Sequence, residues 1–150
     1  MGISKVAVKN TGSMAGPTKR GLQTTKLDVE LKTDDYTVVI ADGGKTFLMA
    51  TDAKTFTLPE IDEEMIGEEF TFVNTGADGN NLVDVAPNAV DAIHGTISNA
   101  AADSVSGGVV NKYIRNTKAT SNKGDFIKIK ALALTEWYII DGVGIWASEA

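Results

Sequence analysis

The stretch GDFIKIKALAL, residues 124–134, decides the fold class of this chain. Its apolar and charged side chains alternate, with Ile127, Ile129 and Ala131 in one phase and Lys128 and Lys130 in the other. Successive side chains of a β-strand point to opposite faces, whereas an amphipathic helix repeats its apolar residues every three to four positions. The stretch therefore predicts a strand with one face in a core and the other in water.

The same period of two recurs along most of the chain from residue 35 onward. The residues expected to face the core are Tyr36, Val38, Ile40, Phe47, Met49, Phe56, Leu58, Phe70, Phe72, Val83 and Val85. Turn signals such as DGG at residues 42–44 separate the segments, because glycine accepts the positive φ angles of tight turns. Near the chain end, EWYIID and IWA flank a GVG turn and are expected to form a hairpin.

About nine or ten strands at roughly ten-residue spacing predict an all-β fold: a single antiparallel β-sandwich or barrel, jelly-roll-like. Residues 88–108 leave two interpretations open. Val90, Ile93 and Ile97 would share one face of a helix, whereas Gly95 and its β-branched neighbours favour short irregular strands. The small residues at 99–108 are expected to form an exposed loop.

The N-terminal region differs from the rest of the chain. Residues 1–33 are rich in Gly, Ser, Thr and Asn and show no sustained period until KLDVELK, in which Leu27, Val29 and Leu31 alternate with polar residues. This pattern predicts a half-buried strand that pairs with the body or with a partner. A chain of 150 residues has room for one core, so we expect an extended arm at 1–34 and one β domain at 35–150.

The net charge also differs between residues 1–34 and the rest of the chain. The net charge is −6; residues 1–34 carry six basic and three acidic side chains, or +3, which leaves −9 for the remainder. The arm is expected either to dock on an acidic surface, a neighbour's included, or to be a solvated leader. The residues expected at an interface with a neighbouring protein are Lys5, Lys9, Lys19, Arg20, Leu27, Val29, Leu31 and Trp146. Nucleic acid is not an expected partner, because an acidic body repels phosphates.

Composition narrows the class of protein further. The chain has no cysteine, so disulfides and thiolate metal sites are not available to it. No apolar run approaches the roughly 20 residues of a membrane span, and the N-terminus lacks the apolar core of a signal peptide. The sequence predicts a soluble protein made in a cytoplasm, without a membrane partner.

The segment TLPEIDEEMIGEEFTF, residues 57–72, concentrates six carboxylates in ten positions: Glu60, Asp62, Glu63, Glu64, Glu68 and Glu69. Paired carboxylates can perform acid–base chemistry in glycosidases when one of them is desolvated. Pro59 ends one strand here and Phe70 begins the next, so the acids lie between two anchored segments where solvation is easy. We expect a solvated connector.

Other candidate sites are weak. Gly44-Lys45-Thr46 lacks the upstream glycine of a phosphate-binding loop, since that position is Val39. Neither the residues GADGNN, which include Asp78, Asn80 and Asn81, nor the single His94 has the spacing or partners of a metal or catalytic site. Trp137 is expected in the core and Trp146 in the core or at a contact surface. We expect no catalytic residue, no cofactor and no metal.

The order of several motifs adds a resemblance. DYTVVIADGGKTFLM precedes FTLPEIDEEMIGEEFTFVNTG, and then come VDVAPNAVDAIHG and GDFIKIKALALTEWYIIDGVGIW, together covering about residues 35–147. This arrangement resembles a β domain of bacteriophage virion proteins, especially head decoration (capsid cement) proteins. The resemblance implies a non-enzymatic structural protein on the capsid exterior that bridges major capsid subunits, often as a homotrimer.

Two other classes remain open. A receptor- or glycan-binding module of a phage tail or tail fibre would need exposed aromatic residues, for which Tyr113, Tyr138 and Trp146 are candidates. A carbohydrate-active enzyme would use the acidic segment, and changing Glu63 and Glu64 to Gln would then abolish its activity.

Overall fold

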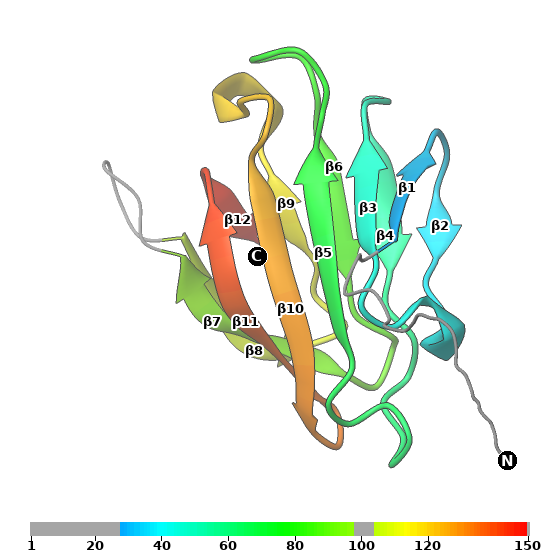
Figure 1. Cartoon of the computed structure of the whole chain (residues 1–150). Helices are drawn as coiled ribbons and strands as arrows, with labels where there is room; N and C mark the ends of the chain where they lie inside the picture. The colour runs from blue at the N-terminus through cyan, green and yellow to red at the C-terminus, as the bar shows by residue number, and fades with distance from the viewer. Residues whose placement is uncertain (1–27, 98–103, 150) are drawn as a thin grey trace, which may run out of the picture.

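A computed structural model describes residues 28–97 and 104–149 of the chain. These residues form two β-sheets that face each other (Figure 1). The seven-stranded sheet has the order β1 (Val29–Lys32), β3 (Thr46–Met49), β5 (Glu69–Asn74), β10 (Phe126–Ala133), β11 (Glu136–Val143), β7 (Ala92–Ile97) and β8 (Ser104–Val110). The five-stranded sheet has the order β12 (Trp146–Ser148), β9 (Ile114–Asn116), β6 (Val83–Ala86), β4 (Lys54–Thr57) and β2 (Tyr36–Thr37).

The all-β class predicted from the sequence is confirmed. Apart from the strands, the described residues contain two short 3-10 helices, η2 (Ile40–Asp42) and η3 (Lys118–Thr120), and no α-helix. Both sheets are mixed, where an antiparallel fold was expected. The first six strands alternate between the two sheets along the chain. Successive strands within each sheet are therefore parallel: β1, β3 and β5 in the larger sheet, and β2, β4 and β6 in the smaller one.

The C-terminal half of the fold is largely antiparallel. β10 lies at the centre of the larger sheet between β5 and β11 and is antiparallel to both. In the smaller sheet β9 is antiparallel to β6 and to β12. β7 adds to β11 in parallel and to β8 in antiparallel orientation.

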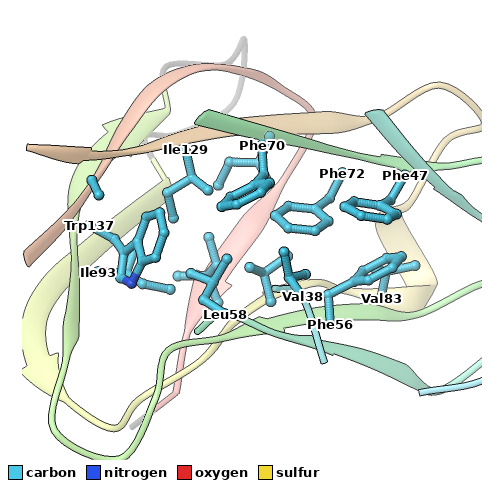
Figure 2. Packing of buried hydrophobic residues seen from close by; sticks show 14 of the residues in the cluster. Val38, Phe47, Phe56, Leu58, Phe70, Phe72, Val83, Ile93, Ile129 and Trp137 are labelled. Carbon is cyan, nitrogen blue, oxygen red and sulfur yellow. The ribbon is translucent and has the colours of Figure 1, made fainter. Parts of the chain in front are cut away.

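The hydrophobic core fills the space between the two sheets. Figure 2 shows rings from the larger sheet facing rings and aliphatic side chains from the smaller one. Phe72 lies near the centre, with ring centroids 4.8 Å from Phe56 across the core and 5.7 Å from Phe47 beside it. Trp137 is fully buried and continues the aromatic cluster 5.8 Å from Phe70. The inward phase predicted for these strands is therefore correct.

Three local predictions need correction. The segment 136–147 is not a hairpin: β11 pairs with β10 and β7, whereas β12 pairs with β9 in the other sheet, and Gly144 (φ 106°) makes the turn between them. Ile40 lies in η2 rather than in a strand and is 40% exposed. The expected loop at 99–108 overlaps β8 from residue 104 onward, and residues 98–103 lie outside the described part.

The structure also decides between the two interpretations of residues 88–108 and tests the N-terminal boundary of the β domain. Of the two interpretations of 88–108, the strand interpretation holds, because Ala92–Ile97 is β7. The boundary expected after residue 34 falls inside the fold, because β1 pairs with β3 in the larger sheet. The alternating pattern of KLDVELK predicted a strand that pairs either with the body or with a partner. In the structure this strand, β1, pairs with the body.

A buried polar network closes the upper end of the fold in Figure 1. Asn74 Nδ2 donates to the Asn81 carbonyl at 2.9 Å and to Asn116 Oδ1 at 2.6 Å. Its Oδ1 accepts from the Gly76 N–H at 3.0 Å and from Asn81 Nδ2 at 2.7 Å. Asn116 Nδ2 in turn donates to Asp125 Oδ2 at 3.0 Å. The network thus connects the ends of β5 and β9 with the loops that precede β6 and β10.

Candidate interaction surfaces

β1 presents its apolar side chains to the outside of the sheet. Val29 is 63% exposed and Leu31 is 59% exposed. Glu30 and Lys32 take the opposite phase and lie in register with core residues of β3. Both exposed residues were predicted as interface residues, and the structure places them on an edge strand.

Charged contacts fix β1 in this orientation. Lys45 bridges Glu30 at 3.1 Å and Asp42 at 2.9 Å, so it connects β1 to the end of η2. The Tyr36 hydroxyl donates to the same Asp42 carboxylate at 2.9 Å. The Lys32 ammonium lies 3.5 Å from the centre of the Tyr36 ring, a cation–π geometry. Because charged side chains occupy the inner phase of β1, its apolar residues must face out.

Asp42 is buried at the centre of this charged cluster. Burial alone would raise the pKa of its carboxyl, but hydrogen bonds from Lys45, the Val39 N–H and Tyr36 outweigh burial, and the pKa is lowered. The pKa of Tyr36 is raised, first by burial and next by its hydrogen bond to Asp42. The ionised form of Asp42 is thus the one that stabilises the fold.

We expect Asp42→Asn to weaken the acid dependence of stability. A carboxyl whose pKa is lower in the folded chain contributes stability that is present above its unfolded pKa, near 3.8, and is lost as the pH falls through the folded value. Urea unfolding should therefore separate wild type from Asp42→Asn at pH 7 and bring them closer at pH 3. Glu64→Gln, which removes one exposed charge, controls for the change in net charge. An equal gap at both pH values would contradict the role of the Asp42 charge.

An apolar row crosses the outer face of the larger sheet. Leu31 is in register with Leu48, and Leu48 with Val73. Phe126 pairs with Val73 on one side and with Val143 on the other. The residues on either side of Leu48, Val73 and Phe126 along their strands are buried, so the row faces out, and its exposed ends Leu31 and Val143 are 59% and 52% accessible. We call these five residues the apolar row.

Only one end of this row was predicted from the sequence. Leu31 was predicted as an interface residue from its alternation, whereas Leu48, Val73, Phe126 and Val143 were not. One signal was present: Leu48 is apolar in the phase that should be polar, between Phe47 and Met49. Placing the five side chains side by side requires the register of five strands, which no local pattern contains.

Most of the acidic segment is a surface connector at the lower end of the fold in Figure 1, as predicted, but Glu68 is half-buried and Glu69 is the first residue of β5. Glu60, Asp62, Glu63 and Glu64 are exposed, while Ile61 and Met65 point into the core. The connector is anchored by Asp91, which is fully buried and whose Oδ2 accepts from the Ile61 N–H at 3.0 Å. Burial raises the pKa of Asp91, and the nearby charge of Glu60 raises it further.

The candidate aromatic residues do not form a cluster. Tyr138 lies on β11 of the larger sheet, where its ring stacks on His94 at 5.2 Å. Tyr113 precedes β9 of the smaller sheet, with the Arg115 guanidinium 4.7 Å from its ring centre. Trp146 is only 3% exposed and its Nε1 donates to the Val143 carbonyl at 3.1 Å. The prediction of Trp146 as an interface residue is therefore corrected: β12 turns it into the core.

The remaining predicted interface residues, Lys5, Lys9, Lys19, Arg20 and Leu27, lie outside the described residues. Within residues 28–97 and 104–149, no three His, Asp or Glu side chains come together in a group that could hold a metal ion. No helix in the same ranges is long and apolar enough to cross a membrane. Comparison with models of protein families and with curated proteins finds no match for this chain.

Proposed function

We propose that this chain is a bacteriophage capsid decoration, or cement, protein without catalytic activity. It would bind the outer surface of an assembled capsid and stabilise the shell by bridging neighbouring major capsid subunits, acting as a homotrimer. The motif order supports the family, and the apolar row is the observation that carries the binding role. A row of large apolar side chains on an open sheet face is unusual for a surface that meets only water.

The row suits a partner that is itself a protein surface. Its central members are half-buried already and its two ends are well exposed, so a flat partner can cover the whole row without rearrangement of the sheet. A protein that binds only the assembled lattice stabilises that lattice by mass action. Several copies bound as one oligomer add their modest contacts through multivalency.

Co-sedimentation with purified phage particles tests the proposal. The full chain should pellet with assembled particles and stay in the supernatant with unassembled major capsid subunits. Immunogold labelling of particles with antibody to this chain should then place gold over the heads. Gold at the tail tip would replace the proposal by a receptor-binding module, and absence of label on intact particles would remove an external role on the virion.

A further inference from the structure

The lower end of the fold combines acidic and apolar side chains on one surface. The acids are Glu60, Asp62, Glu63 and Glu64 of the connector, all exposed. The apolar residues are Ile66 (44% exposed), Val90 (49%), Leu132 (50%) and Leu134 (53%). We call these eight residues the acidic end.

Backbone hydrogen bonds bring these segments together. The Gly67 N–H donates to the Ala131 carbonyl at 2.8 Å and the Ala131 N–H to the Glu68 carbonyl at 3.0 Å, so the connector runs beside the end of β10. The Ala92 N–H donates to the Thr135 carbonyl at 2.9 Å, which places the loop before β7 against the turn after β10. The acidic end is therefore built from the connector, the loop before β7, and the end of β10 with the turn that follows it.

The described chain begins at this same end. The Asp28 carbonyl accepts from the Thr46 N–H at 2.9 Å, and the Gly44 N–H donates to the Glu69 carbonyl at 2.9 Å. β1, β3 and β5 are parallel, and Val29, Thr46 and Thr71 are in register, so β1 begins two residues past the start of β5, the strand that follows the acidic connector (Figure 1). The described chain therefore begins nearer the start of β5, which the acidic connector enters, than the end of β5, which carries the buried asparagine network.

Residues 1–27 carry the complementary chemistry. They contain five basic residues and no acidic one, a charge of +5, so residues 28–150 carry −6 − 5 = −11. The stretch ISKVAVK, residues 3–9, mixes apolar side chains with lysines, as the acidic end mixes apolar side chains with carboxylates. We propose that residues 1–27 dock on the acidic end of their own chain.

Tethering favours the chain's own segment over that of a second copy. Twenty-seven residues span up to about 90 Å when extended, at roughly 3.3–3.6 Å per residue, which is ample for a surface at the same end of the fold. A short flexible tether gives an effective concentration in the millimolar range, far above that of other copies in dilute solution. Docking would cover the basic segment in the free protein and release it only to a partner that binds it more tightly.

Cysteine trapping tests this docking, because the chain has no cysteine of its own. The pair Val6→Cys with Glu64→Cys should form a disulfide within one chain, at ~1 µM protein and low salt, at least about tenfold faster than the control. The control pair is Val6→Cys with Asn80→Cys, an exposed position in the loop after β5 at the other end. Non-reducing gels and mass spectrometry distinguish bonds within a chain from bonds between chains.

The charges give a second, independent measurement. Glu60→Gln with Glu63→Gln, added to the first pair, should slow trapping severalfold, and 1 M salt should do the same because it shortens the screening length to about 3 Å. Equal rates for the two cysteine pairs would overturn the proposal. Disulfides found only between chains would overturn it too, in favour of docking on a second copy. Neither result depends on capsid binding, so this proposal and the proposed function fail separately.

Discussion

Asn74→Ala is expected to lower the free energy of unfolding by about 3–5 kcal/mol. The side chain is 1% exposed and uses both of its N–H groups and its oxygen in four hydrogen bonds. Truncation leaves the Gly76 N–H, the Asn81 carbonyl and Asn116 Oδ1 without these partners in a buried site. Each buried polar group left unpaired costs about 1–3 kcal/mol, and partial entry of water offsets some of the sum.

Urea unfolding followed by tryptophan fluorescence measures this loss, since Trp137 and Trp146 are both buried in the native core. Asn80→Ala is the matched control: it is the same substitution at an exposed position in the loop that follows β5. We expect it to change stability by less than about 0.5 kcal/mol. If Asn74→Ala were no more destabilising than Asn80→Ala, the network would not be what closes the upper end of the fold.

The network also shows where prediction from the sequence stops. The NTGADGNN segment was correctly predicted as a turn, because glycine and asparagine mark turns locally. The distinction between Asn74 and Asn81, which are buried, and Asn80, which is exposed, was not predicted. It depends on Asn116, which lies 42 positions away in the sequence from Asn74 and bonds to it across the two sheets.

For the fold, too, local sequence patterns predict some features, whereas other features depend on residues far apart in the sequence. Which residues face the core follows from the period of two within each strand, and Phe47, Phe72 and Ile129 are buried as predicted. The period of two does not determine which strands pair with each other. The period is the same in either sheet, so nothing in residues 136–148 distinguishes a hairpin from a chain that crosses between sheets at Gly144.

Leu31→Lys combined with Val143→Lys is expected to weaken binding to assembled capsids by at least about 100-fold. Covering the exposed half of a Leu or Val side chain is worth about 1 kcal/mol, and about 2.7 kcal/mol in total corresponds to 100-fold in affinity. Each ammonium would also have to lose water against an apolar partner surface, which adds to the cost. Both residues are the exposed ends of the apolar row, so the fold itself should keep its stability to within about 1 kcal/mol.

Val39→Lys combined with Val109→Lys is the matched control for this loss. It adds the same two charges at residues that are 47% and 54% exposed and lie off the row. Sedimentation with particles across a range of protein concentrations should give the wild-type affinity for the control and a large loss for the row variant. Equal losses would mean that net charge, not the row, governs binding. If both variants kept the wild-type affinity, another surface would contact the capsid. The charged N-terminal residues would then be the next to be substituted.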